Sequence, residues 1–245
     1  YKYVLGLKKK SYVQLSGLEQ RINSPQTRDL VRRLNLAAIT VLNNKNHILP
    51  LHTDKEQTIA LLEVGDPGET DALAKQLSRY TSLARFSLRA NQTEEENQRL
   101  RDSLSTYKRI IVAVSEQRLA PYQPFFAKFV PESPAIYLFF TPGKMMLQIQ
   151  RAVAHASAVV LGHSYNSDVQ RQVADVLFAK ASADGQLSAS LGELFPTGAG
   201  VTITPKTPLH FVPEEYGLSS AHLKRYSFII GWYSSGSYPV ARWWC

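Results

Sequence analysis

Short apolar runs alternate along this sequence with segments in which apolar residues recur at helical spacing. The runs have the length of buried strands and occupy residues 58–64, 83–88, 110–114, 135–140 and 158–162. A strand, a helix and a second, parallel strand form the repeating unit of α/β proteins, so this alternation predicts a mostly parallel sheet. We expect a three-layer αβα sandwich of five to six strands with helices on both faces.

Three of the expected helices have clear signals. The first is predicted from apolar residues at helical spacing, which are Leu30, Val31, Leu34, Ala37 and Ala38. Residues 39–42 are consistent with a continuation of this helix. The second helix begins after Thr93, because Glu96 three residues later completes a capping-box pattern. The third has an apolar face at i, i+4, i+7 and i+8, made of Val169, Val173, Val176 and Leu177.

Length and composition fit one large globular domain with extensions at its ends. The chain has 245 residues, of which 44% are hydrophobic and 20% charged, which argues against a disordered or fibrous protein. No apolar run approaches the roughly 18 residues that indicate a membrane span. The single cysteine, Cys245, excludes an internal disulfide. Because the chain begins at Tyr1 without a signal-peptide pattern, we expect an internal piece of a longer protein.

The positive net charge is interpreted as a solvated surface. The formal charge is +8, but the basic clusters at residues 8–10 and at Arg28, Arg32 and Arg33 are not interleaved with aromatic side chains. Nucleic-acid surfaces commonly combine basic groups with aromatic rings on which bases stack. We therefore expect no nucleic acid among the partners of this chain.

Familiar motifs of phosphate, metal and nucleophile chemistry do not occur in the sequence. The turn at residues 65–68 matches neither glycine-rich phosphate motif, and Pro67 removes an amide donor, so a plain turn is favoured. The six histidines are dispersed and form no H-E-x-x-H. G-x-S-x-G is absent, and an S-x-x-K match at Ser105 and Lys108 is best explained by chance. We expect neither a metal nor a cofactor.

One loop stands out as a candidate binding site. It follows the run at residues 158–162, where open α/β sheets place ligand-contacting residues, and it holds His163, Ser164, Tyr165, Asn166 and Asp168. These polar side chains could hydrogen-bond the hydroxyl groups of a sugar. The sequence alone favours a plainer alternative, in which Ser167 or Asp168 caps the following helix and His163 is an ordinary loop residue.

Several short motifs, in order, resemble the C-terminal domain of glycoside hydrolase family 3. Residues 2–7 resemble the K-Y-x-x-G-L end of the connection between the family's barrel and its sandwich domain. Residues 37–44 with 48–51 resemble its A-x-T-L-L-K-N … L-L-P-L passage. Residues 173–178 with 185–187 resemble A-x-x-L-F-G … G-x-L-P, although Ala179 and Ser188 replace the usual glycine and proline. Residues 195–201 resemble the F-x-x-G-x-G tail of the β-N-acetylhexosaminidase branch.

The resemblance implies a domain arrangement and a reaction. Residues 1–30 would connect to a preceding (β/α)8 barrel, residues 31–204 would form the sandwich, and residues 205–245 would be a linker and the start of another domain. Residues 216–239 are similar to the opening of a β-lactamase-like domain. In the family the nucleophile lies in the barrel, and in the β-N-acetylhexosaminidase branch the acid/base lies there too, so no catalytic residue is assigned in this chain. The implied reaction is retaining hydrolysis of terminal β-linked N-acetylhexosamine.

The expected partners are the chain's own barrel domain and, through it, a carbohydrate substrate. Such a parent enzyme is expected to be periplasmic or secreted. Two alternatives remain at this point: a β-glucosidase-type domain that supplies an acid/base glutamate, and a non-catalytic carbohydrate-binding or structural module.

Overall fold

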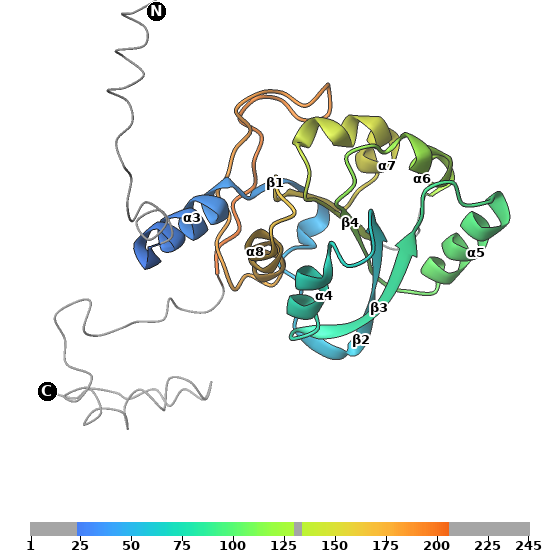
Figure 1. The fold of residues 1–245 in the computed structure, drawn as a ribbon, viewed down its shortest axis with the longest axis horizontal. Helices are drawn as coiled ribbons and strands as arrows, with labels where there is room; N and C mark the ends of the chain where they lie inside the picture. The colour runs from blue at the N-terminus through green and yellow to red at the C-terminus, as the bar shows by residue number, and fades with distance from the viewer. Residues whose placement is uncertain (1–23, 130–133, 206–245) are drawn as a thin grey trace, which may run out of the picture. The chain divides into compact units, whose positions relative to one another are not determined.

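The described part of the chain, residues 24–129 and 134–205 of a computed structural model, is built around one six-stranded sheet. The spatial order is β1-β6-β5-β4-β2-β3; Figure 1 labels β1, β2, β3 and β4. Neighbouring strands run parallel except β1, which is antiparallel to β6. The strands are β1 (Thr40–Asn44), β2 (Asp54–Val64), β3 (Thr81–Leu88), β4 (Ile110–Val114), β5 (Ala135–Phe139) and β6 (Ala158–Leu161). The expectation of a mostly parallel sheet is confirmed.

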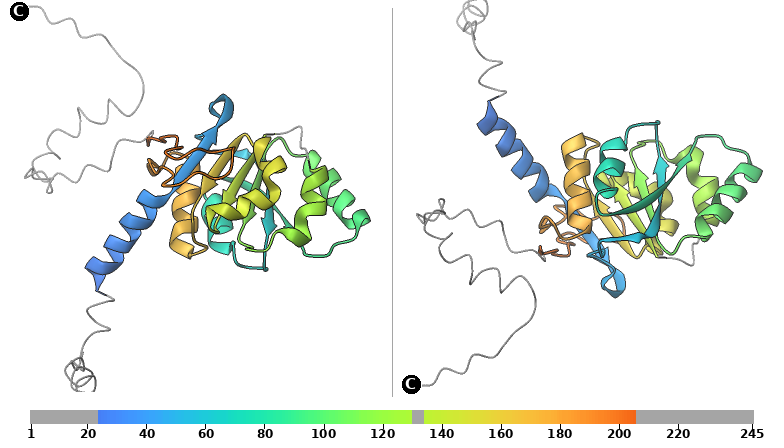
Figure 2. Two further views of the ribbon diagram at one scale, coloured as in Figure 1. Left: turned by 90° about the horizontal axis from the view of Figure 1, so that it is seen from above. Right: turned by 90° about the horizontal axis from the view of Figure 1, so that it is seen from below.

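Helices cover both faces of this sheet, as the two views in Figure 2 show. One face carries α4 (Asp71–Leu77) and α8 (Ser167–Leu177), and α3 (Pro25–Ala38) packs beside α8. The other face carries α5 (Glu94–Ser105), α6 (Gln123–Lys128) and α7 (Gln150–Ala154). Three 3-10 segments complete the set: Lys45–His47, Ala120–Tyr122 and Gly143–Ile149. The expected three-layer αβα sandwich is confirmed.

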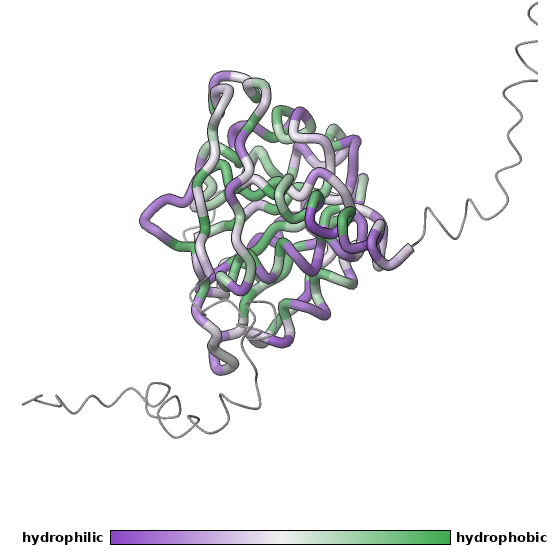
Figure 3. The backbone as a smooth tube through the Cα atoms, turned by 90° about the vertical axis from the view of Figure 1, so that its left-hand side faces the viewer, coloured by the Kyte–Doolittle hydropathy of each residue, from purple (hydrophilic) through white to green (hydrophobic). Residues whose placement is uncertain are grey.

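The core has two halves, one on each face, because successive side chains of a strand point to opposite sides. Leu61 and Ile111 belong to the half under α4 and α8. Leu62 and Val112, one residue further along, belong to the half under α5, α6 and α7. Burying each such side chain stabilises the fold by about 1.5–3 kcal/mol. Because helices cover both faces of the sheet, the central strands are apolar almost throughout. Figure 3 shows these hydrophobic stretches in the interior of the fold.

The predicted start of α5 is confirmed in detail. The Thr93 hydroxyl accepts a hydrogen bond from the Glu96 amide at 3.2 Å, and the Glu96 carboxylate accepts one from the Thr93 amide at 2.9 Å. Two of the unpaired amides at the helix start are thereby satisfied, which is why this pattern identified the boundary.

The prediction for residues 39–42 was wrong. They do not continue α3; Ile39 has extended backbone angles, and residues 40–44 form the edge strand β1. Thr40 and Val41 lie opposite Leu161 and Val160 of β6. Their β-branched side chains suit a strand, and burial against β6 outweighs the helical pattern that precedes them.

An irregular segment, residues 183–203, crosses the β1 edge; we call it the C-terminal strap. Ala183 and Ile203 exchange two backbone hydrogen bonds, and the Val201 amide donates to the Val41 carbonyl at 2.7 Å. Ala183 and Ile203 thereby form an isolated antiparallel β-bridge. Gly185 and Gly200 make the crossing possible, because a Cβ on Gly200 would lie 2.4 Å from the Gly185 carbonyl oxygen.

Some sequence-based expectations fall outside the described residues. These are the barrel-connection motif at residues 2–7 and the β-lactamase-like opening at residues 216–239. Within residues 24–129 and 134–205, no helix combines the length and the apolar character needed to cross a membrane.

Candidate functional site

The loops that follow β2, β4, β5 and β6 all lie at the carboxyl edge of the sheet, because these four strands run parallel. After β2 the chain moves outward to β3, and it then returns to place β4 on the other side of β2. Open α/β sheets bind ligands outside the carboxyl ends of their strands, at the point where the strand order reverses. In this fold that point lies between β2 and β4.

The sequence-predicted loop from His163 to Asp168 belongs to this edge because it follows β6; in the structure the loop covers residues 162–166, and α8 begins at Ser167. His163 has a left-handed backbone, with φ of 63°, and its side chain is exposed. The Tyr165 side chain is 57% exposed. Partial desolvation lowers the pKa of His163 below its ordinary value, so its imidazole is neutral at neutral pH and can both donate and accept a hydrogen bond.

Asn166 and Asp168 are engaged in starting α8, and the Ser164 hydroxyl accepts a hydrogen bond from the Asn166 amide at 3.2 Å. Asn166 is the N-cap, since its side-chain oxygen accepts a hydrogen bond from the Asp168 amide at 2.7 Å. The expectation that Ser167 or Asp168 caps the helix was therefore wrong. Asp168 lies in the first turn and pairs with Arg171 one turn later. A carboxylate is favourable there because the amides at a helix start carry partial positive charge.

Sequence reasoning missed a second loop at the same edge, residues 65–70, which links β2 to α4. Gly65 has φ of 145°, and a Cβ there would lie 2.2 Å from the Ser115 hydroxyl oxygen and 3.1 Å from the Glu69 carboxylate. The loops after β2 and β4 are thus in direct contact. The turn at residues 65–68 was expected to be plain, and only the strand order reveals that it borders the reversal point.

The loops after β2 and β4 carry three acidic residues: Asp66 and Glu69 lie in the 65–70 loop, and Glu116 follows Ser115 after β4. The pKa of Tyr122 is raised first by burial and then by the charges of Glu116, Asp66 and Glu69. Within the described part of the chain, no three His, Cys, Asp or Glu side chains are arranged to hold a metal ion. The edge can therefore offer hydrogen-bond acceptors to a polar ligand, and its carboxylates do not form a metal site.

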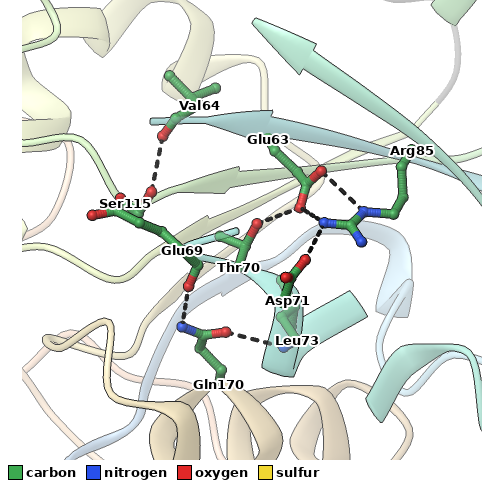
Figure 4. A network of polar contacts seen from close by, with 9 residues as sticks. All are labelled: Glu63, Val64, Glu69, Thr70, Asp71, Leu73, Arg85, Ser115 and Gln170. Carbon is green, nitrogen blue, oxygen red and sulfur yellow. Dashed lines mark hydrogen bonds and ion pairs between the residues drawn. The ribbon is translucent and has the colours of Figure 1, made fainter. Parts of the chain in front are cut away.

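An ion-pair network holds the start of α4 against the sheet (Figure 4). Arg85 of β3 donates two hydrogen bonds to Glu63 of β2, at 3.1 and 2.8 Å, and one to Asp71 of α4 at 2.5 Å. The Thr70 hydroxyl donates to the same Glu63 carboxylate. The end of the 65–70 loop is therefore fixed to two strands. The acidic residues of the network are paired, in contrast with Asp66 at the loop tip, which has no ion pair among the described residues.

The proposed chance match at Ser105 and Lys108 has a simple structural setting. Ser105 lies at the exposed end of α5, and its hydroxyl donates to the Asp102 carbonyl at 2.7 Å. A backbone hydrogen bond of this kind is common for serine in the last turn of a helix. It gives Ser105 a local structural partner.

Comparison by sequence identifies no relatives: no protein-family model matches the chain, and no curated protein matches it. Comparison by structure does identify similar folds. A fungal multi-domain β-N-acetylglucosaminidase of glycoside hydrolase family 3 matches with a TM-score of 0.57 and 13% identity, over 80% of this chain and 22% of that protein. The β-glucosidase from Listeria innocua bound to isofagomine matches with a TM-score of 0.54 and 16% identity, over 70% of this chain and 28% of its own.

A third similar structure is the β-glucoside phosphorylase BglX, with a TM-score of 0.53 and 17% identity, over 75% of this chain and 36% of that protein. At these identities the similarity establishes the fold alone. The chain spans between about a fifth and about a third of the length of these three proteins.

Proposed function

We propose that residues 31–204 are the C-terminal sandwich domain of a family 3 glycoside hydrolase that acts on terminal β-linked N-acetylhexosamine. The observation that carries this proposal is the fold similarity over 80% of the chain to a family 3 β-N-acetylglucosaminidase. The ordered motifs at residues 37–51, 173–187 and 195–201 support the same assignment independently. In this proposal the catalytic residues belong to a separate barrel, and the sandwich is an accessory domain.

The surface of α3 supports a partner domain on the amino-terminal side. Leu30, Val31 and Leu34 are 48%, 47% and 59% exposed, and they lie within little more than one turn of one helix. The described residues have only one other large hydrophobic side chain as exposed, that of Tyr165. A cluster of exposed apolar side chains commonly marks an interface. We infer that this face of α3 packs against the catalytic barrel.

The loop at residues 162–166 is proposed to contact the sugar. Its His163 and Ser164 can hydrogen-bond hydroxyl groups, and the exposed ring of Tyr165 offers the flat apolar surface on which sugar rings commonly pack. Asn166 and Asp168 act mainly through the start of α8, so they hold the loop in shape and present its exposed members.

The proposal is tested by comparing the 245-residue chain with its full-length parent protein on an aryl N-acetyl-β-glucosaminide and an aryl β-glucoside. We expect the parent to hydrolyse the first substrate preferentially and with retention of configuration, and the isolated chain to be inactive. Hydrolysis by the isolated chain would contradict the accessory role. Preference of the parent for the β-glucoside would contradict the proposed specificity, and an inactive parent would indicate a structural module.

A further inference from the structure

Gln170 joins the two loops of the carboxyl edge. It lies in the first turn of α8 and is only 2% exposed. Its amide nitrogen donates to the Tyr165 carbonyl of the 162–166 loop and to the Glu69 carbonyl of the 65–70 loop, both at 2.6 Å. Its amide oxygen accepts from the Leu73 amide of α4 at 3.0 Å (Figure 4).

This arrangement specifies glutamine at position 170. Both partners of the side-chain nitrogen are carbonyl oxygens and the partner of its oxygen is an N–H, so the amide has one possible orientation. Asparagine would be one methylene too short, and a carboxylate would face two carbonyl oxygens. Because Gln170 is buried, the two loop carbonyls could not replace it by bulk water without rearrangement.

We propose that Gln170 is a positioning residue, which makes residues 65–70 and residues 162–166 a single rigid rim so that a sugar at this edge contacts both loops. The coupling of the two loops is inferred from the three hydrogen bonds of Gln170, whereas the sugar contact rests on the function proposed above. The rim then extends the candidate site from His163 and Tyr165 to Asp66, which lies on a loop that no sequence motif identified.

Gln172 provides a matched control on the same helix. It is also a buried amide, 6% exposed, and its nitrogen donates to the Arg32 carbonyl of α3 at 2.8 Å. Its hydrogen bond therefore joins two helices and does not touch either loop of the rim. Gln170→Met and Gln172→Met each remove a buried amide from α8; the first releases three hydrogen bonds and the second one, and they differ in which segments they release.

Hydrogen exchange of the 245-residue chain tests the coupling directly. For Gln170→Met we expect protection factors to fall by about tenfold or more in both loops together, because each loop loses its bond to the same nitrogen. For Gln172→Met we expect both loops to keep their wild-type protection. Loss of protection in only one loop, in neither loop, or equally in both variants would overturn the proposal.

Gln170→Glu keeps the inference testable if the methionine variant fails to fold. A protonated carboxyl can still donate one hydrogen bond and accept another, whereas the ionised form repels the carbonyls of Tyr165 and Glu69. We expect protection in both loops to be lower at about pH 8 than at about pH 5, after correction for the intrinsic exchange rate. At about pH 8, wild-type protection in either loop would again reject the coupling, because the ionised carboxylate faces the carbonyls of both loops.

Kinetics of the full-length parent separate the coupling from the sugar contact. With an aryl N-acetyl-β-glucosaminide, Gln170→Met should raise KM by about fivefold and change kcat by less than about twofold, because binding geometry is disturbed while the reacting groups lie elsewhere. Gln172→Met should change neither constant. If both loops lose protection but KM stays at the wild-type value, the coupling is correct and the proposed sugar contact is wrong.

Discussion

Tyr80 lies just beyond α4 and links that helix to α8. Its hydroxyl donates to the Asp175 carboxylate at 2.7 Å, and Gln76 donates to the same oxygen at 2.6 Å. Its ring packs on Phe178 with centroids 4.7 Å apart. Burial, followed by the hydrogen bond to Asp175 and its charge, raises the pKa of Tyr80 to about 12. One residue thus makes the contact between two helices sensitive to high pH.

The sign of this pH dependence follows from linkage. Tyrosine in an unfolded chain ionises near pH 10, so the stability that Tyr80 contributes is fully present below about pH 10 and is lost as the pH rises towards 12. We expect Tyr80→Phe to lower the free energy of unfolding by about 0.5–1.5 kcal/mol at pH 7. The difference between wild type and Tyr80→Phe should shrink above pH 10. Urea denaturation across this range measures it, and a constant difference would contradict the assignment.

Gly65 is the residue on which the contact between the loops after β2 and β4 depends. Gly65→Ala introduces both a strained φ of 145° and a Cβ 2.2 Å from the Ser115 hydroxyl oxygen. We expect a loss of about 2–4 kcal/mol of unfolding free energy. Ser115→Ala in the same background removes the clashing oxygen and should recover part of this loss, while the backbone strain remains. Denaturation of the two single variants and the double variant measures the coupling, and strictly additive effects would disprove the clash.

Among the elements, the C-terminal strap shows how two glycines allow one segment to cross another. Gly185 lies over β1, where a Cβ would be 2.5 Å from the Ile39 carbonyl oxygen, and Gly200 lies against Gly185. Gly198, two residues earlier, has φ of 81° but has no atom within 4 Å of the Cβ position. Glycine is therefore required at position 200 by close packing and at position 198 by the backbone conformation.

Alanine substitutions should distinguish these two requirements. Gly198→Ala is expected to lower the free energy of unfolding by about 1–2 kcal/mol, the usual penalty for a residue with a side chain in a left-handed backbone conformation. Gly200→Ala should lower the free energy of unfolding further, because its Cβ would lie 2.4 Å from the Gly185 carbonyl oxygen and would force the strap away from β1. We expect hydrogen exchange at the Val201 amide to accelerate in Gly200→Ala more than in Gly198→Ala. Equal effects of the two substitutions would show that close packing is not the cause.

The exposed face of α3 gives a second prediction at the scale of elements. Leu34 is 59% exposed, so Leu34→Glu should change the unfolding free energy of the 245-residue chain by no more than about 0.5 kcal/mol. In the full-length parent the same substitution should destabilise the packing of α3 on the barrel and lower the unfolding free energy by about 1–2 kcal/mol. Gln26→Glu, at an exposed polar position of the same helix, is the control. Equal effects of Leu34→Glu in both proteins would refute the docking.

For the molecule as a whole, the sequence predicted the elements that a local run of apolar residues is sufficient to define. The five parallel strands were all predicted, and β4 at both ends, because runs such as Ile110–Val114 are buried on both faces and are bounded by polar residues; β2 begins four residues before the predicted run. The strand β1 was not predicted, because its five residues follow a helix directly and only pairing with β6 makes them a strand. Local spacing cannot identify a contact between residues 40 and 161.

The candidate site was predictable only in its first loop. Residues 162–166 were found because polar residues follow a strand, a relation visible along the chain. Glu116 comes close to the loop of Asp66 and Glu69 only because β4 pairs with β2, and its amide donates to the Val64 carbonyl at 3.2 Å; the sequence did not state this pairing. The contacts of Gln170 were equally hidden, because its three partners lie five, 97 and 101 residues away.

The hydrogen bond between Val201 and Val41 has a consequence for modularity. The first strand of the sheet, β1, and the last described segment, the C-terminal strap, are neighbours, since the strap crosses β1 (Figure 1). A fold whose entry and exit points are adjacent can be carried as an insertion in a loop of another protein, because little loop-closure entropy is lost when the host joins both points. The sandwich thus meets a geometric condition for insertion into another protein as a unit.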